Sequence, residues 1–152
     1  MRNDHYTGRK LDLTGVAEVE IFLEDTKICD ITSMIIPSFP VNIAGFGYNL
    51  VSEFDIDSTL IPGLTRVVID EDLGEVAFKI VYIKQGVFDI NVEGRSIIVM
   101  IDENKYTFFS EGIVLAIGNK VNDAEFDMNV ENDLSQKMKL AILSFPMLRF
   151  AL

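Results

Sequence analysis

The sequence predicts a mainly antiparallel all-β domain, built as a β-sandwich or a barrel, with at most one short helix. Three observations lead to this fold class. Apolar and polar residues alternate along several segments, polar turn residues recur every eight or nine positions between Glu75 and Ile117, and the intervening segments are rich in β-branched and aromatic residues. The 152 residues, 49% of them hydrophobic, match the length and composition of one globular domain.

Charge divides this single domain, residues 1–152, into three parts. A basic N-terminal arm, residues 1–10, carries Arg2, Arg9 and Lys10 against Asp4, a net charge of +2. An apolar and basic C-terminal tail, residues 134–152, carries +3. Taking these two contributions from the total of −11 leaves −16 for residues 11–133. An acidic body repels phosphates, so no specific nucleic-acid binding is expected.

Period-two alternation marks the strands, because successive side chains of a strand point to opposite faces of the sheet. One face of each strand is then apolar and suited to a core, and the other is polar. The alternating segments, with their apolar positions, are 18–21 (Val19, Ile21), 53–57 (Phe54, Ile56), 88–93 (Phe88, Ile90, Val92) and 123–131 (Ala124, Phe126, Met128, Val130).

Turn residues set the limits of the predicted strands. Polar turns at 85–86, 93–94, 102–104, 111–112 and 118–119 indicate an antiparallel meander across residues 75–117. Pro37 and Pro40 follow a predicted strand at 27–36, and with Gly45 and Gly47 they predict a structured loop over 37–47.

The C-terminal tail allows two structures. Asp133 or Ser135 is a suitable N-cap for a short helix through Leu143 that Pro146 would end. Residues 138–145 are equally suited to a last strand, and the strand is slightly favoured.

No catalytic or metal-binding constellation is visible, and no cofactor is expected. The single histidine, His5, and the single cysteine, Cys29, are too few for a zinc site or an intrachain disulfide, which favours a reducing compartment. The pair Gly45 and Gly47 opens like a dinucleotide-binding fingerprint, but position 50 is leucine and no βαβ unit surrounds it.

The densest acidic cluster, Asp70-Glu71-Asp72 with Glu75, does not have the spacing of a calcium-binding EF-hand loop. We interpret it as an exposed turn between two strands.

The chain also lacks the sequence signals of a membrane or secreted protein. No apolar run approaches the roughly 18 residues of a membrane span, and the N-terminus has no apolar signal-peptide core. We therefore expect a cytoplasmic or virion location, with no membrane partner.

Residues 68–101 resemble the stretch of trimeric dUTPases that runs from their V-I-D-x-D-Y-x-G-E motif to their G-D-R-I motif. The resemblance implies a nucleotide hydrolase in which Asp70 orients the attacking water with Mg²⁺. The sequence departs from the family pattern at Leu73, which stands in place of the motif tyrosine, and one residue is missing before Gly74. The family's serine motif and glycine-rich arm have no counterpart.

The charge distribution favours a non-enzymatic structural or assembly protein that forms a homo-oligomer, such as a bacteriophage tail-tube, baseplate or decoration subunit. No small-molecule substrate is expected. The alternatives are a degenerate dUTPase-like hydrolase and an acidic binding or inhibitor module for a basic partner. The candidate interaction residues are Arg2, Arg9, Lys10, Glu53, Asp55, Asp57, Asp123, Glu125, Asp127, Glu131, Phe145, Leu148 and Phe150.

Overall fold

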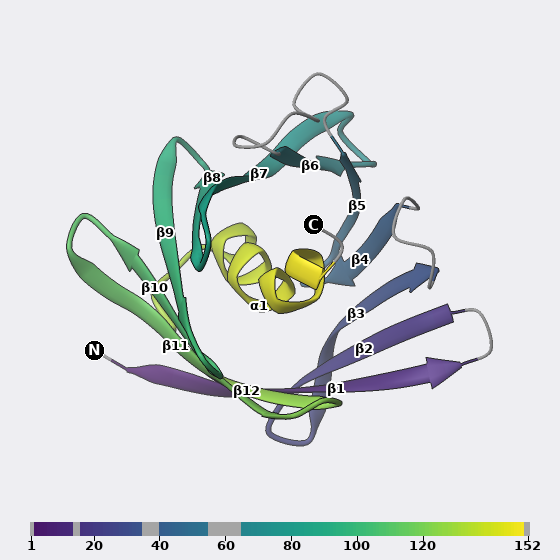
Figure 1. The fold of residues 1–152 in the computed structure, drawn as a ribbon. Coiled ribbons are helices and arrows are strands. Elements are labelled where there is room, and N and C mark those ends of the chain that lie inside the picture. The colour runs from purple at the N-terminus through teal and green to yellow at the C-terminus, as the bar shows by residue number, and fades with distance from the viewer. Residues whose placement is uncertain (1, 14–15, 35–39, 55–64, 151–152) are drawn as a thin grey trace.

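The computed structural model describes residues 2–13, 16–34, 40–54 and 65–150. These residues form twelve β-strands and one α-helix, and the strands close into a single barrel around the helix (Figure 1). The fold is therefore a barrel rather than a sandwich, within the all-β class that the sequence predicts.

The strands are β1 (Asn3–Leu13), β2 (Val16–Leu23), β3 (Thr26–Met34), β4 (Val41–Gly45), β5 (Tyr48–Phe54), β6 (Thr65–Asp70), β7 (Glu75–Lys84), β8 (Val87–Val92), β9 (Arg95–Asp102), β10 (Lys105–Ser110), β11 (Ile113–Asn122) and β12 (Glu125–Glu131), and the helix is α1 (Gln136–Phe150).

The barrel is an antiparallel meander throughout, since each strand pairs with its neighbours in the sequence. The meander predicted over residues 75–117 corresponds to β7–β11 and is confirmed. The first and last strands also pair, with Asn3 opposite Glu131 and Arg9 opposite Glu125. Each of the twelve described strands therefore has a neighbour on both sides, which protects its edges from pairing with another chain.

The predicted alternation is present in the barrel wall. On β12, Met128 and Val130 are buried inside the barrel, whereas Glu125 and Asn129 are exposed. Four of the five predicted turns are present, at 85–86, 93–94, 103–104 and 111–112, whereas the turn predicted at 118–119 was wrong because these residues lie inside β11. Glu93, Glu103 and Glu111 adopt positive φ angles of 51–53° in tight hairpin turns, a backbone region that such two-residue connections demand.

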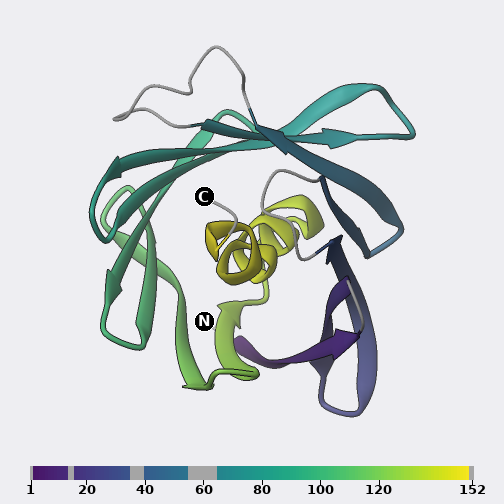
Figure 2. The same cartoon turned by 45° about the vertical axis from the view of Figure 1, so that its right-hand side comes forward.

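Helix α1 runs through the middle of the barrel and fills it (Figures 1 and 2). An eight-stranded barrel has room only for its own side chains, so twelve strands enclose a wider space that needs further filling. The buried side chains of α1 point all around its axis and are Met138, Leu140, Ala141, Ile142, Leu143, Ser144, Phe145, Pro146 and Leu148. The preference for a C-terminal strand was therefore wrong, and the tail is a core helix.

Ser135 begins the helix as its N-cap. Its Oγ accepts a hydrogen bond from the backbone N–H of Met138 at 3.2 Å, and its carbonyl accepts the first intrahelical bond from Lys139 at 3.0 Å. The hydroxyl of Ser135 also donates to Glu93 in the β8–β9 turn, which ties the start of α1 to the barrel wall. The expectation that Pro146 ends the helix was wrong, because Pro146 lies inside it.

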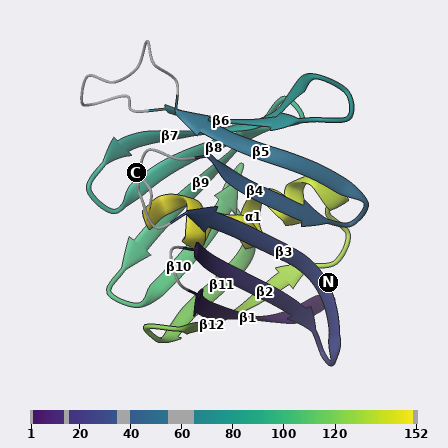
Figure 3. The ribbon, with the colours of Figure 1, turned by 90° about the vertical axis from the view of Figure 1, so that its right-hand side faces the viewer.

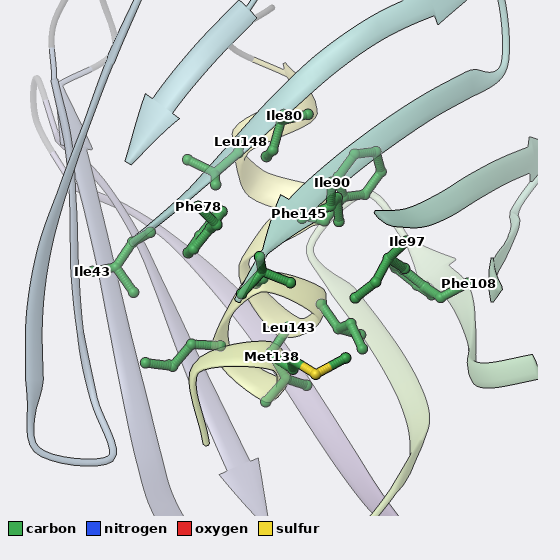
Figure 4. Packing of buried hydrophobic residues seen from close by; sticks show 14 of the residues in the cluster. Ile43, Phe78, Ile80, Ile90, Ile97, Phe108, Met138, Leu143, Phe145 and Leu148 are labelled. Carbon is green, nitrogen blue, oxygen red and sulfur yellow. The ribbon is translucent and has the colours of Figure 1, made fainter. Parts of the chain in front are cut away.

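An aromatic cluster joins α1 to β8 and β10. The Phe145 ring lies edge-on to Phe88, Phe108 and Tyr106, with ring centroids 5.2, 5.8 and 6.3 Å apart. Aliphatic side chains from the wall, including Ile90 on β8, point toward the same helix (Figure 4). Edge-on aromatic pairs are favourable beyond the area they bury, so this cluster fixes the depth and rotation of α1.

Two further segments, one in the predicted 37–47 loop and one in the N-terminal arm, form strands in the structure. Residues 41–45 of the predicted 37–47 loop form β4, which pairs with β3 and β5, and residues 37–39 lie outside the described part. Asn42 and Ala44 face out while Val41 and Ile43 are buried, so this short segment does alternate, and the glycines that suggested a loop belong to the β4–β5 turn. The N-terminal arm is part of β1 and pairs with β2 and β12 (Figure 3).

Candidate functional site

The apolar residues that the sequence suggests for docking to a neighbour lie inside the barrel. Phe145 and Leu148 are both 0% exposed in the core. Phe150 belongs to the last turn of α1, and only its backbone is described. The described part of the tail is therefore already packed against its own barrel, and Phe145 and Leu148 are not available to a second molecule.

The structure places the charged candidates to different extents. Asp55 and Asp57 lie outside the described residues, and Glu53 is placed in β5 by its backbone only. Arg2 precedes β1 and Lys10 lies within it, and both are exposed. Glu131 is half-buried at the end of β12.

Asp70, the residue that the dUTPase resemblance singles out, is 3% exposed. Its Oδ1 accepts hydrogen bonds from the backbone N–H groups of Asp72 at 3.0 Å and Leu73 at 3.3 Å. This is the geometry of an Asx turn, in which a carboxylate stabilises the hairpin that follows it. The stretch 68–101 forms part of β6, then β7, β8 and most of β9, all consecutive strands of the wall.

The outer surface of β1–β3 is charged and internally paired. Glu20 lies 3.7 Å from Arg9 and 3.4 Å from Lys27, and Lys27 also lies 3.2 Å from Asp30. These contacts raise the pKa of Lys27, chiefly through its hydrogen bond to Asp30. Glu18, Glu20 and Asp30 form a carboxylate cluster there, and Lys27 balances part of its charge.

The outer surface of β8–β11 has the opposite character. Of the apolar side chains that point away from the barrel here, we call six the apolar face: Val87, Ile98, Met100, Phe109, Val114 and Ile117. Met100 is 49% and Val114 43% exposed.

Strand register makes the apolar face continuous. Ile98 lies opposite Phe109, and Phe109 lies opposite Val114. Met100 lies between Val87 and Thr107 in the next row. Directly opposed side chains are about 5 Å apart, close enough to touch. Sequence reasoning did not single out this surface, although residues 97–101 are all apolar, a run typical of a strand with both faces buried.

A groove of about 470 Å³ lies at one end of the wall, where β1, β2, β11 and β12 meet. It is lined by Thr7, Gly8, Arg9, Phe22, Glu24, Asp25, Val121, Glu125, Phe126 and Asp127. Three of the predicted interaction residues, Arg9, Glu125 and Asp127, thus come together in it. Asp123, on the preceding turn, is fully exposed and pairs with Lys120 at 3.2 Å.

The surroundings of two buried titratable groups, Cys29 and Arg66, indicate structural roles. Burial raises the pKa of the Cys29 thiol to about 12, with a smaller contribution from Asp30, so the thiol stays protonated and unreactive. Arg66 is fully buried, and its Nη1 donates to Ser52 Oγ at 2.6 Å. Burial lowers the pKa of the Arg66 guanidinium to about 10.

Among the residues that the structure describes, no helix has the length and apolar character needed to cross a membrane. No protein-family model matches the chain, and neither does any curated protein or solved structure.

Proposed function

We propose that this protein is a non-enzymatic structural or assembly protein whose working unit is a homo-oligomer joined through the apolar face. The single observation that carries the proposal is the continuous, partly exposed apolar surface on β8–β11. Monomeric soluble proteins rarely expose contiguous apolar surface of this kind without a use for it.

A second copy of the chain is the occupant that the surface suits best. Two copies of the apolar face can each cover the other with apolar surface. A two-fold axis lying in the plane of contact would pack them as two sheets face to face. Two charged side chains border these rows in the described strands: Lys84 lies opposite Val87, and Asp89, opposite Ile98, accepts a hydrogen bond from Ser96 at 2.5 Å. A bacteriophage particle subunit is one case of this proposal, and self-association is the part that the surface supports.

Salt separates this proposal from assembly through charged arms. A contact between a basic arm and an acidic face would weaken as salt screens it. An apolar contact between two chains of net charge −11 should instead hold or strengthen with salt, because screening reduces their mutual repulsion.

The test is sedimentation velocity of the wild type and of two matched variants at low and high salt. Val114→Lys places a charge in the apolar face, and Val76→Lys makes the same change at a 52% exposed valine on β7 outside it. We expect the wild type and Val76→Lys to be oligomeric and Val114→Lys to be monomeric. A wild type that stays monomeric at every salt and protein concentration, or two variants with equal effects, would contradict the proposal.

The hydrolase alternative has a simple assay of its own. Asp70 has a structural explanation in the β6–β7 turn, since its carboxylate caps two backbone amides. We expect no pyrophosphate from incubation with deoxynucleoside triphosphates and magnesium. Release that is lost in Asp70→Asn would support the hydrolase instead.

A further inference from the structure

The groove between β1, β2, β11 and β12 has an apolar floor. Phe22, Phe126 and Val121 line it, and Val121 is 57% exposed. The Phe126 ring lies directly over Gly8, where a Cβ would stand 2.3 Å from two ring carbons. Tyr6 and Met128, on the same face of β1 and β12, are buried in the core, so this ring lies on the inner side of the wall. The apolar side chains on the outer side of the groove are those of Phe22 and Val121.

The rim of the groove is acidic. Glu24 and Asp25 come from the β2–β3 turn, and Glu125 and Asp127 come from β12. None of these four carboxylates forms an ion pair within the part of the chain that the structure describes.

Arg9 is the one cation of the lining, and its charge is already engaged. Its guanidinium lies 3.7 Å from Glu20, outside the groove, and 5.9 Å from the centroid of the Phe22 ring. A guanidinium near an aromatic ring is a favourable cation–π contact. Because Arg9 is engaged with Glu20, it leaves the four carboxylates around the groove uncompensated. Its contact with the Phe22 ring also shows that an aromatic side chain of the groove accepts a guanidinium.

We propose that this groove binds a basic peptide segment of a partner protein, with an arginine or lysine between the carboxylates and an adjacent apolar side chain against Phe22 and Val121. The volume of about 470 Å³ lies within the range of ligand pockets, roughly 300–1,000 Å³. Charge complementarity selects a cationic partner and excludes a phosphate backbone. The groove shares β11 with the apolar face, but its lining contains none of the six residues of that face, so this inference does not depend on self-association through it.

The experiment uses fluorescence polarisation with a labelled Gly-Arg-Phe-Arg-Phe-Gly peptide on the full chain. A Gly-Gln-Phe-Gln-Phe-Gly peptide tests the need for positive charge. The same titrations on Val114→Lys separate the groove from the apolar face, because they should give unchanged binding even if self-association is abolished.

Two double variants with equal change of charge locate the site. Glu125→Gln with Asp127→Asn neutralises the groove, and Asp102→Asn with Glu103→Gln neutralises the exposed β9–β10 turn. We expect the groove variant to bind the arginine peptide about fivefold to tenfold more weakly, from two exposed ion pairs lost. The turn variant should bind within about twofold of the wild type, because its charges are remote and screened.

Three outcomes would overturn the inference: equal losses in the two double variants, equal binding of the arginine and glutamine peptides, or no binding of either. Both double variants change only exposed or half-exposed side chains. Circular dichroism melting curves should therefore be unchanged, which keeps a loss of binding interpretable.

Discussion

Strands β9 and β10 carry apolar side chains on both of their faces, and the two faces differ in what covers them. On the inner face, Ile97, Val99 and Phe108 are 0% exposed and pack in the core with α1 (Figure 4). On the outer face, Ile98, Met100 and Phe109 alternate with them and keep part of their surface open to water. The comparison teaches that apolar character alone does not make a core, since one face is packed against α1 and the other remains partly open to water.

The largest expected effect is on the inner face. Phe145→Ala removes the ring that contacts Phe88, Phe108 and Tyr106, and it should lower the free energy of unfolding by about 3–5 kcal/mol through lost burial and a cavity. Urea denaturation followed by circular dichroism measures this. A loss no greater than that of Met100→Ala on the outer face would remove the distinction between the two faces.

Alkaline pH offers a second test, of how well the barrel interior excludes water. The pKa of Cys29 is raised from 9.0 to about 12 in the folded chain, and burial raises the pKa of Tyr6 as well. Groups with a raised folded pKa stabilise the fold below their ordinary pKa, and that stability is lost as pH rises toward the folded value. Between pH 8 and pH 11, Cys29 should account for a loss of about 2–3 kcal/mol.

The control for this pH dependence is Cys29→Ala, whose stability should fall less steeply over the same range in urea titrations. An identical slope in both proteins would show that the thiol is accessible to water in the native state.

A matched pair of substitutions sharpens the comparison with the smallest chemical change. Val99→Thr introduces a hydroxyl on the inner face and should cost about 1–3 kcal/mol, because the hydroxyl is desolvated there. Val114→Thr makes the same change on the outer face and should alter the stability of the monomer by about 0.5 kcal/mol or less. Thermal melts of the two variants, measured with Val114→Lys as the monomeric reference, decide the matter; a reversed order would contradict the assignment of faces.

A smaller effect than those of the inner-face substitutions is expected where α1 begins. Ser135→Ala removes the N-cap bond to Met138 and the hydroxyl donated to Glu93, and should lower stability by about 1 kcal/mol. Ser135→Asp retains a capping acceptor but places a carboxylate beside Glu93, so it should recover only part of the loss in urea denaturation. Full stability in Ser135→Ala would indicate that packing alone holds the helix.

Much of the barrel was predictable because local chemistry determines it. The alternation around Met128 and Val130 identifies a strand and its inward face, and turn residues such as Glu93-Gly94 fix the hairpins. Closure was not predictable in the same way. It depends on pairing between Asn3 and Glu131, far apart in the chain, and no local pattern records that contact.

The helix was misjudged for a physical reason. Amphipathic helices are recognised by an apolar stripe, but α1 is surrounded by the barrel and is apolar on nearly every side. Pro146 added a misleading signal, since it removes one backbone donor from a helix whose packing holds it in place.

The candidate surfaces were predictable only in part. Glu125 and Asp127 were recognised as a polar face, but their meeting with Phe22 and Glu24 requires the β12–β1–β2 pairing. The apolar face was missed because a strand with two apolar sides has no alternation to assign them.

The position of α1 also constrains how the protein folds. The helix follows β12 in the chain, so every strand leaves the ribosome before the segment that belongs at the centre. If the barrel wall closed first, it would enclose an empty interior and keep α1 out. The final pairing between β1 and β12 should therefore form only once the helix is inside. Until then the inner faces are exposed, and this late step is where a destabilised variant is most prone to aggregate.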